Sequence, residues 1–453
     1  MALFLFMMGY IVYFNLFRSQ EMVSSPYNNK RQNIYADRVI RGKIIDQGEN
    51  TIAETIVNED GSETRSYPYG DMYGHVAGYA SNGKAGLEAT ENFKLMNSSA
   101  FFVEKMIKEF KGEKNMGDTV VTTLNNTLQS AAYDALGGSK GAVVVMEPST
   151  GKILAMLSKP CYDPNSVAEN WEALNADGDG ILVNRATQGA YAPGSTFKLV
   201  TALDFIRENP SYGAYTYECN GEITQDNVTI HCFDGTAHGT VTLADSIAYS
   251  CNSSFANIGL SLDKTKYKNT AEDLLFNKSL PSELPYRKSS FKLNTKSTSA
   301  ETMMTAMGQG QTEVSPYHMA LITSSIANGG ILMKPYLVDK ITNYNGTTVK
   351  NYRPEKYKEL MTAQEASQLK EYMRGVVEYG TATIFAGENY TMAGKTGTAE
   401  YSSDKEKAHS WFVGFSNVDN PELVISVVVE GADDSGVKAT NVAKAVIDAY
   451  YYG

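Results

Sequence analysis

Residues 192–200, Ala-Pro-Gly-Ser-Thr-Phe-Lys-Leu-Val, place a serine and a lysine three positions apart where a helix should begin. The proline and the glycine break the preceding chain, and apolar residues recur at helical spacing from Thr196 to Phe205. Ser195 and Lys198 would then share one face of the first helical turn. The stretch therefore predicts a turn that opens a helix and brings both side chains together.

A serine beside a lysine can act as a nucleophile when the lysine takes up the hydroxyl proton. The lysine can do this if burial leaves its amine neutral for part of the time. A helix N-terminus helps, because its positive end disfavours an ammonium group and its free N–H groups can bind an oxyanion. The pair alone is weak evidence, since a surface serine next to a solvated lysine has the same spacing.

Two further motifs follow along the chain, Ser250-Cys251-Asn252 and Lys395-Thr396-Gly397-Thr398. The motifs Ser-x-x-Lys, Ser-Asp-Asn and Lys-Thr-Gly occur together in β-lactamases and penicillin-binding proteins. From about residue 20 to its end, the chain resembles a class B penicillin-binding protein of the short penicillin-binding protein A type. Three more stretches carry the resemblance: Asn184-Arg185-Ala186, Gly308-Gln309-Gly310 and Trp411-Phe412-Val413-Gly414.

The predicted elements mix helices and strands. Strands at 142–146 and 153–157 flank a Pro- and Gly-containing turn and predict a hairpin, with helical patterns on either side in sequence. Such a hairpin suggests an α+β domain in which helices sandwich an antiparallel sheet. The resemblance implies the serine-type penicillin-binding transpeptidase fold for residues 131–453. It also implies a β-rich pedestal, or dimerisation-like domain, at residues 19–130.

Other elements follow from local patterns. We expect strands at 51–57, 392–399, 411–415 and 423–430, and helices at 87–98, 124–136, 242–248, 253–260, 301–307, 319–327, 362–378 and 440–450. Thr362 and Glu365 form a capping box at one helix start. We expect a hairpin turn at 344–347, a loop at 163–180 and a β excursion at 219–240.

The N-terminal run from Leu3 to Phe17 is almost continuously apolar and ends at Arg18. It is marginal for a membrane-spanning helix, which needs about 17–25 residues. A buried terminal helix is the alternative, but the run is apolar on every face and no signal-peptidase pattern follows it. We therefore expect residues 1–18 to be an uncleaved transmembrane anchor. The resemblance implies a single-pass protein of the cell membrane with an extracytoplasmic catalytic domain, although no basic residue precedes the run to orient it.

The third motif invites comparison with a phosphate-binding loop, because Gly394-Lys395-Thr396 has the sequence Gly-Lys-Thr. That loop needs a glycine at position 389, which is asparagine, and it should open a helix rather than continue a strand. At a strand edge, Lys395 instead offers a cation for a substrate carboxylate, and Thr396 and Thr398 offer hydroxyl groups. Gly397 leaves room for a substrate peptide to add to the strand.

In isolation, the second motif would be read as a helix cap. Beside the other two motifs, the resemblance implies that Ser250 relays the proton between serine, lysine and leaving group. It implies that Asn252 hydrogen-bonds the lysine and the substrate amide. We expect Cys251 to be a small buried apolar residue rather than a thiol nucleophile, because no histidine stands near it in the sequence.

The resemblance implies acyl transfer on peptidoglycan. Neutral Lys198 takes the proton of Ser195, which attacks the penultimate D-alanine carbonyl of a stem peptide on a lipid-linked precursor. The backbone N–H groups of Ser195 and Thr398 would hold the oxyanion. D-Alanine leaves, an amine of a neighbouring stem peptide resolves the acyl-enzyme, and β-lactams trap Ser195 by mimicking the donor.

Three other functions are alternatives to transpeptidation. A class A β-lactamase needs a Glu-x-x-x-Asn between the second and third motifs, and no glutamate between Asn252 and Lys395 has an asparagine four residues later. A D,D-carboxypeptidase would use water as the acceptor, and the pedestal and anchor argue only weakly against it. A non-catalytic cell-wall scaffold would have no need of Ser195, Lys198, Ser250, Asn252 and Lys395.

Composition and spacing limit the other partners. The net charge of −11 and the lack of a basic patch argue against nucleic acid binding. We expect no cofactor and no metal, because the five histidines have no ligand spacing. Cys219 and Cys232 either form a disulfide or remain free, half-buried thiols, and the sequence does not decide between these. The resemblance implies a SEDS-type glycosyltransferase as partner, and we expect the chain to polymerise no glycan itself.

Overall fold

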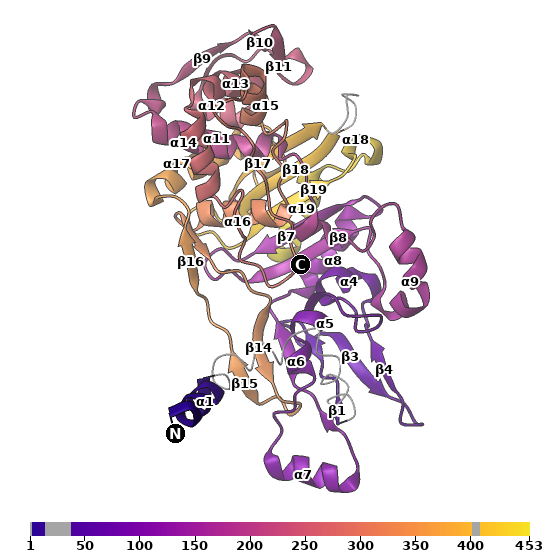
Figure 1. The fold of residues 1–453 in the computed structure, drawn as a ribbon. Coiled ribbons are helices and arrows are strands. Elements are labelled where there is room, and N and C mark those ends of the chain that lie inside the picture. Colours follow the sequence, from indigo (N-terminus) through magenta and orange to yellow (C-terminus); the bar gives the residue numbers. More distant parts are fainter. Residues whose placement is uncertain (1, 14–37, 401–407) are drawn as a thin grey trace. The chain divides into compact units, whose positions relative to one another are not determined.

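The structure is a computed structural model that describes residues 2–13, 38–400 and 408–453. The chain divides into two compact units. Unit 1 comprises Met1–Thr123, Tyr162–Leu174 and Val338–Tyr352, and unit 2 comprises Leu124–Cys161, Asn175–Leu337 and Arg353–Gly453. Figure 1 labels the helices and strands of both units.

Unit 1 is built on a six-stranded sheet with the strand order β15-β14-β6-β2-β3-β4. Its strands are β2 (Ile44–Ile45), β3 (Thr51–Val57), β4 (Glu63–Ser66), β6 (Thr119–Thr122), β14 (Val338–Thr342) and β15 (Thr348–Asn351). The last two come from far along the chain, and β14 pairs antiparallel with β6. The expected hairpin turn at 344–347 joins β14 to β15. A short parallel pair, β1 (Val39–Ile40) with β5 (Asn115–Met116), completes the strands of this unit.

A buried carboxylate organises the loops and short helices of unit 1. Glu88, which is fully buried, receives hydrogen bonds from Arg41 Nε at 2.5 Å and Arg65 Nε at 2.7 Å. Tyr67 donates a further bond to the same carboxylate at 3.2 Å. Burial opposes ionisation, but the two guanidinium groups hold the pKa of Glu88 below its usual value. The negative charge of Glu88 is therefore balanced by Arg41 and Arg65 inside the unit, and the carboxylate is not accessible to a substrate.

The helices of unit 1 are short. They are η2 (Gly70–Tyr73), α4 (Gly74–Ala77), α5 (Gly86–Thr90), α6 (Asn92–Leu95) and α7 (Phe102–Lys111). The single helix expected at 87–98 is wrong, because Glu91 has non-helical backbone angles and separates α5 from α6. The expected loop at 163–180 is also wrong: η3 (Pro164–Ser166) leads into α9 (Val167–Ala176). Asp163 caps this start and a proline occupies its first turn, a pattern typical of helix N-termini.

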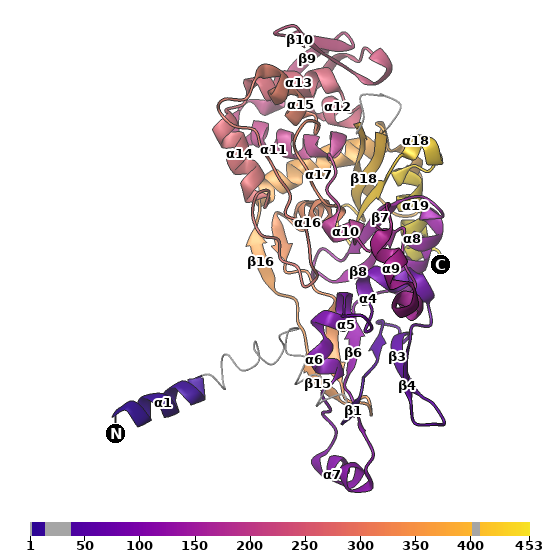
Figure 2. The ribbon, with the colours of Figure 1, turned by 45° about the vertical axis from the view of Figure 1, so that its right-hand side comes forward.

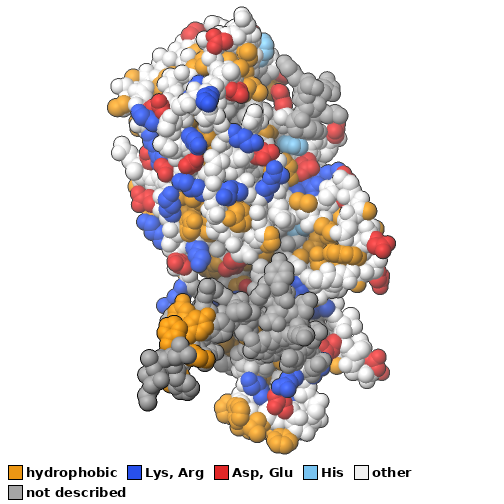
Figure 3. Space-filling view, viewed as in Figure 1, with side chains coloured by type: hydrophobic (Ala, Val, Ile, Leu, Met, Phe, Trp, Pro, Cys, Tyr) orange, Lys and Arg blue, Asp and Glu red, His pale blue; other side chains and the backbone are white. Residues whose placement is uncertain are grey.

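Helix α7 leaves its apolar face in solvent. Phe102 and Phe110 of the helix are 68% and 86% exposed, and Phe101, which precedes it, is 74% exposed. The last turn of the helix carries Lys108 and Lys111. Figure 3 shows hydrophobic side chains gathered at the bottom of the view, where Figure 1 labels α7, beside basic and acidic side chains. An exposed apolar patch of this kind is typical of a surface that contacts a partner or a membrane.

The N-terminal helix α1 (Ala2–Tyr13) is apolar, with no charged residue in its first or last turn. Among the residues that the structure describes, no helix has both the length and the apolar character needed to cross a membrane. Residues 14–18 of the expected anchor lie outside the described part of the chain. The anchor therefore stays a prediction.

Unit 2 contains a five-stranded antiparallel sheet with the strand order β17-β18-β19-β7-β8. Its strands are β7 (Gly141–Met146), β8 (Ile153–Lys159), β17 (Met392–Glu400), β18 (Ala408–Ser416) and β19 (Val424–Val429). Figure 1 shows the late strands β18 and β19, in yellow, beside the early strands β7 and β8, in magenta. The predicted hairpin and the three predicted C-terminal strands are confirmed.

Helices cover both faces of this sheet. All residues of β7 and β19 are buried, which requires cover on both sides because successive side chains point to opposite faces. Helices α8 (Asn126–Leu136) and α19 (Ala439–Tyr451) pack on each other and on the sheet, while α10 (Arg185–Gln188) and α16 (Pro316–Ala327) also contact its strands. Every residue of α16 is buried. Figure 2 shows α8 beside α19 and α16 at the other side of the strands. The predicted helix–sheet–helix sandwich is confirmed.

The remaining elements of unit 2 lie around the predicted motifs. They are η4 (Gly194–Phe197), α11 (Lys198–Glu208), η5 (Tyr212–Ala214), β9 (Thr216–Cys219), β10 (Glu222–Gln225), β11 (Val228–His231), η6 (Phe233–Gly235), β12 (Gly239–Thr242), α12 (Leu243–Ala248), α13 (Asn252–Ser261), α14 (Lys264–Asp273), α15 (Ser299–Ala306), β13 (Ile331–Met333), β16 (Lys356–Glu359), α17 (Ala363–Glu378), η7 (Thr383–Phe385) and α18 (Ala432–Ser435). The capping box at the start of α17 and the β excursion at 219–240 are confirmed.

Candidate active site

Ser195 lies in the tight turn η4, which continues directly into helix α11. Two glycines, Gly194 and Gly308, let backbone segments pack closely against this turn. Gly194 has a φ of +54°, and a Cβ atom there would lie 2.4 Å from the carbonyl oxygen of Thr398. A Cβ on Gly308, whose φ is +84°, would lie 1.8 Å from the carbonyl oxygen of Gly194. The position of Ser195 is therefore set by backbone packing, with its own side chain half-buried.

Lys198 is fully buried at the start of α11. Its Nζ donates to the backbone carbonyl of Ser250 at 2.7 Å and to Oδ1 of Asn252 at 2.6 Å. Burial lowers the pKa of Lys198 to about 7. A neutral amine has two N–H groups and one lone pair, so these two acceptors can take both hydrogens. The lone pair then remains available to accept a proton from a hydroxyl group.

The second motif joins α12 to α13. Ser250 has a φ of +57°, a left-handed conformation that costs a non-glycine residue energy and is often found at functional sites. Its Oγ lies 3.2 Å from Lys198 Nζ. Asn252 uses the two ends of its amide separately: Oδ1 accepts from the lysine, and Nδ2 donates to the backbone carbonyl of His231 at 3.0 Å.

The third motif lies on β17, the first strand in the order of the five-stranded sheet. Lys395 is fully buried, and its Nζ donates to Ser250 Oγ at 2.9 Å and to the carbonyl of Thr396 at 3.0 Å. Burial, and secondarily the charge of Lys198, lower the pKa of Lys395 well below its usual value. A Cβ on Gly397 would lie 3.0 Å from the side chain of Thr196, so the strand runs close to the nucleophile turn. Thr398 is exposed.

One hydroxyl group thus links the two lysines. Ser250 Oγ lies within hydrogen-bond distance of Lys198 and of Lys395. The Ser195 side chain makes no hydrogen bond to any described residue, so its hydroxyl group is free to meet a substrate. The arrangement provides a nucleophile, a neutral amine as base, and a hydroxyl relay leading to a second cation.

Comparison with known proteins identifies the family. The model of the penicillin binding protein transpeptidase domain matches residues 141–448, which is more than half of the chain.

The chain belongs to the penicillin-binding protein transpeptidase family.

The model of the penicillin binding protein A dimerisation domain matches residues 41–120 of the same chain. The chain is 32% identical over 412 residues to the peptidoglycan D,D-transpeptidase PbpA of Mycolicibacterium smegmatis, covering 85% of this chain and 84% of that protein. The resemblance drawn from the three motifs is therefore confirmed at the level of the family.

Solved structures agree with this penicillin-binding protein fold. A D,D-transpeptidase domain from Eggerthella lenta matches with a TM-score of 0.82 and 32% identity, covering 91% of this chain and 98% of that chain. Penicillin-binding protein A from M. tuberculosis, as an imipenem acyl-enzyme complex, matches with a TM-score of 0.83 and 29% identity, covering 92% and 99%.

Two contacts at the candidate site of this penicillin-binding protein were not predicted. Thr381 Oγ1 lies 2.6 Å from Thr396 Oγ1, which fixes the orientation of a hydroxyl group in the third motif. Trp411 Nε1 donates to the carbonyl of Ala192 at 3.1 Å and anchors the chain before the nucleophile. The sequence carried a signal for Trp411, which lies in a family-like stretch, but none for Thr381.

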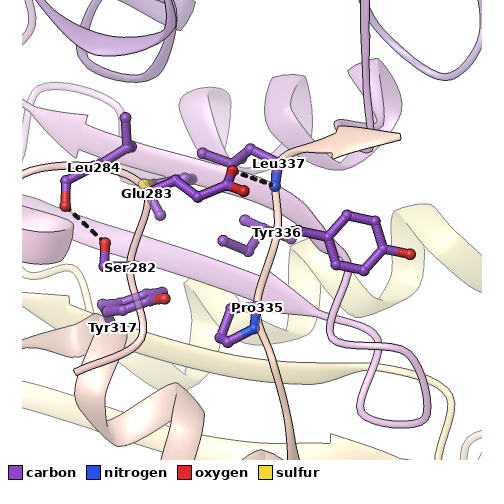
Figure 4. A pocket seen from close by; sticks show the side chains of 9 residues that line it. Ser282, Glu283, Leu284, Tyr317, Pro335, Tyr336 and Leu337 are labelled. Carbon is purple, nitrogen blue, oxygen red and sulfur yellow. Dashed lines mark hydrogen bonds between the residues drawn. The ribbon is translucent and has the colours of Figure 1, made fainter. Parts of the chain in front are cut away.

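A small pocket elsewhere in unit 2 of this penicillin-binding protein contains none of the motif residues (Figure 4). Ser282, Glu283, Tyr317 and Tyr336 contribute to its lining. Glu283 accepts a hydrogen bond from the backbone N–H of Leu337 at 3.3 Å, so its carboxylate serves to hold a loop. The pocket is thus a packing feature, because the motif residues lie on η4, at the start of α11, at the junction of α12 and α13, and on β17.

The structure also decides the state of the cysteines. Cys219 and Cys232 are free and buried, with their Sγ atoms 3.7 Å apart, so the thiol alternative holds and the disulfide does not. Cys251 is buried, as expected. The histidines have no ligand spacing in the sequence, yet the structure places Nδ1 of His238 3.3 Å from Cys219 Sγ. Residues distant in sequence meet here, which spacing alone could not reveal.

Proposed function

We propose that the chain is a peptidoglycan D,D-transpeptidase that forms an acyl-enzyme on Ser195 and is inhibited by β-lactams. The observation that carries the proposal is the buried Lys198, which has a pKa of about 7 and lies three residues after a serine with an unbonded hydroxyl group. The name of the M. smegmatis relative and the acyl-enzyme structure of the M. tuberculosis protein support it.

Acylation begins with proton transfer from Ser195 Oγ to the neutral amine of Lys198. The serine oxygen then forms a bond to the carbonyl carbon of the penultimate D-alanine, and the carbonyl oxygen becomes an oxyanion. The backbone N–H groups of Ser195 and Thr398 stabilise that charge. The proton passes through Ser250 to the nitrogen of the terminal D-alanine, whose amide bond breaks to release the free amino acid.

The two lysines have different tasks in this scheme. Both are buried and both bond Ser250 Oγ, so a positive charge on one disfavours a positive charge on the other. The carboxylate of the stem peptide would stabilise an ammonium on Lys395. Substrate binding therefore favours the state in which Lys395 is charged and Lys198 is neutral, which is the state needed for proton transfer.

The second half-reaction requires an amine. The amine of a neighbouring stem peptide attacks the ester carbonyl, gives its proton back through Lys198, and releases Ser195 with a new amide bond. If water took the place of the amine, the same residues would perform D,D-carboxypeptidation. The position of β17 at the start of the sheet order supports a peptide substrate, because an extended chain can pair with a free strand edge.

Intact mass spectrometry with penicillin tests the proposal. The full-length protein should gain the mass of one penicillin, and peptide mapping should place the adduct on Ser195. Ser195→Ala should remove the adduct, while Ser211→Ala, at an exposed serine outside the motifs, should keep it. A folded protein without adduct would favour the non-catalytic scaffold. An adduct that forms and quickly hydrolyses would favour a β-lactamase.

We also propose that residues 1–18 anchor the protein in the cell membrane, with the catalytic domain outside the cytoplasm and a SEDS-type glycosyltransferase as partner. The apolar sequence of α1 and the exposed apolar face of α7 support contacts with a membrane or a membrane protein. Protease treatment of intact spheroplasts should cleave the catalytic domain but not a cytoplasmic control protein. Release of the full-length protein by a high-salt wash of membranes, without detergent, would contradict the anchor.

A further inference from the structure

Four potential metal ligands meet beside the second motif. They come from the β excursion and the motif itself: Cys219 ends β9, Cys232 follows β11, His238 precedes β12, and Cys251 precedes α13. Their ligand atoms all lie within 4.8 Å of one another. The three cysteines are buried and the histidine is half-buried. We call these residues the Cys3His cluster.

The distances in the Cys3His cluster fit a tetrahedral ion. The Sγ atom of Cys232 lies 3.7 Å from that of Cys219 and 3.8 Å from that of Cys251. In a tetrahedral zinc site, Zn–S bonds of about 2.3 Å place two sulfurs about 3.8 Å apart. The same geometry places a sulfur and an imidazole nitrogen about 3.6 Å apart. Cys219 Sγ and His238 Nδ1 lie 3.3 Å apart, within 0.3 Å of that spacing.

Neither a disulfide nor apolar packing accounts for all four residues of the Cys3His cluster. A disulfide needs sulfurs about 2.05 Å apart and would leave the third cysteine and the histidine without a role. Apolar packing would explain three buried cysteines, which do pack with Val241, because free cysteine is often buried. It would not explain why an imidazole nitrogen points at one of the sulfurs.

We propose that this part of the chain binds one Zn²⁺ ion in a closed, tetrahedral site formed by Cys219, Cys232, His238 and Cys251. Three thiolates and one imidazole are a common ligand set for structural zinc, and no position is left for water or substrate. On binding, each thiol loses its proton to solvent and forms one Zn–S bond. Zinc is favoured over magnesium or calcium, because those ions prefer oxygen ligands.

Groups around the Cys3His cluster are suited to hold thiolates. The hydroxyl oxygen of Ser253 lies 3.1 Å from Cys219 Sγ and 3.5 Å from Cys232 Sγ, within reach of a hydrogen bond to sulfur. The backbone N–H of Ser254 donates to Cys251 Sγ at 3.4 Å. That N–H belongs to the first turn of α13, where the helix dipole favours negative charge. Hydrogen bonds of this kind orient metal ligands.

The ion would also hold part of the candidate active site. Cys251 lies between Ser250 and Asn252, and Cys232 follows His231, whose carbonyl accepts from the Asn252 amide. Binding of both cysteines to one ion would fix the backbone on either side of that hydrogen bond. Asn252 in turn accepts from Lys198. We therefore assign the ion a positioning role for the second motif, an assignment that rests on the proposed function, whereas metal binding itself does not.

Metal content of the full-length protein tests the site. Purified without chelator and under reducing conditions, the protein should contain about one zinc per chain by elemental mass spectrometry. His238→Ala should lose most of this zinc, and its half-buried position makes the substitution tolerable for folding. Cys161→Ser, at a half-buried cysteine outside the cluster, should retain it. A protein that holds no zinc, and takes up none after reduction and addition of ZnCl₂, would overturn the proposal.

A second measurement needs no variant. Replacing zinc with Co²⁺ in the native protein should give visible absorption bands typical of tetrahedral cobalt and charge-transfer bands typical of thiolate ligands. An octahedral cobalt spectrum without thiolate bands would overturn the proposal. Chelation of the zinc should also slow penicillin acylation of Ser195 at least about tenfold, and zinc should restore it. Unchanged acylation after complete zinc removal would overturn the positioning role while leaving metal binding intact. A protein with zinc but no acylation would instead contradict the proposed function.

Discussion

Lys198 donates a hydrogen bond of 2.6 Å to the side-chain oxygen of Asn252, and the same side chain donates through its nitrogen to the backbone of the β excursion. Asn252 therefore cannot rotate without losing one of two bonds. The base of the proposed reaction is held by an amide that is itself held at its other end. The orientation of Lys198 thus depends on a segment that contains none of the three motifs.

Removing this amide should slow acylation without unfolding the protein. We expect Asn252→Ala to lower the second-order rate of penicillin acylation about a hundredfold, because a displaced base loses alignment with Ser195. The measurement is the time course of adduct formation by intact mass. Asn257→Ala, on the same helix and with its side-chain amide donating to the Tyr215 hydroxyl group, should change the rate little. Equal losses in both variants would show that helix α13 was disturbed as a whole.

The acylation rate should depend on pH in a defined direction. The neutral form of Lys198 is the active base, and burial lowers its pKa to about 7. The rate should therefore rise about tenfold per pH unit below pH 7 and level off above it. Burial also lowers the pKa of Lys395, so its ammonium is lost at a lower pH than that of an exposed lysine, and binding of the drug carboxylate should weaken as that charge is lost. Adduct formation measured from about pH 5.5 to about pH 8.5 checks this sign, and a rate that falls through pH 7 would contradict it.

Ser250 has a hydroxyl group that contacts both lysines and a backbone with a positive φ. Two substitutions distinguish the effect of the hydroxyl group from that of the backbone conformation. Ser250→Gly and Ser250→Ala should both lower acylation, since each removes the oxygen that bonds Lys198 and Lys395. Glycine tolerates the φ of +57° and alanine does not, so Ser250→Gly should be the more stable variant by about 1 kcal/mol. Urea unfolding measures the difference in free energy. An alanine variant as stable as the glycine variant would argue against backbone strain at this position.

The buried carboxylate of unit 1 should matter for stability rather than for chemistry. Glu88→Gln leaves Arg41 and Arg65 without their shared counter-charge and should destabilise unit 1 by about 3–5 kcal/mol. Glu63→Gln, which breaks an ion pair nearer the surface, should cost less than about 1 kcal/mol. Hydrogen exchange of peptides from unit 1 measures the loss of stability in each variant. Since the pKa of Glu88 is lowered in the fold, its contribution is present above its unfolded pKa and is lost as pH falls through the folded value. Equal exchange in the two variants would contradict the proposed role of the network.

The parts of the fold that were predictable depend on neighbours in sequence. The helix from Ala363 to Glu378 begins at the residue after its predicted cap, because Thr362 and Glu365 satisfy the first N–H groups locally. The three motifs were likewise found as short patterns, and the structure brings Lys198, Ser250, Asn252 and Lys395 together. Their individual catalytic roles stay predictions.

The parts that were missed depend on distant pairing or on weak local signals. The return of β14 to pair with β6 joins residues more than two hundred positions apart, which no local pattern encodes. The approach of His238 to Cys219 depends on the pairing of β9 with β12. Thr381 has no motif at all, yet its hydroxyl group orients Thr396. Helix α9 was missed for a different reason, since its starting signal at Asp163 was present but was read as part of a loop.

The strand order of the unit 2 sheet has a consequence for synthesis on the ribosome. Strand β7 is made early, but its neighbour β19 lies more than 270 residues later in the chain. A nascent chain therefore carries Ser195 and the second motif long before the strands that complete the sheet have emerged, with one long edge of β7 unpaired. Reactivity towards penicillin should appear only after the last strands are released from the exit tunnel. Until then the cell must keep an apolar strand from pairing with the wrong chain.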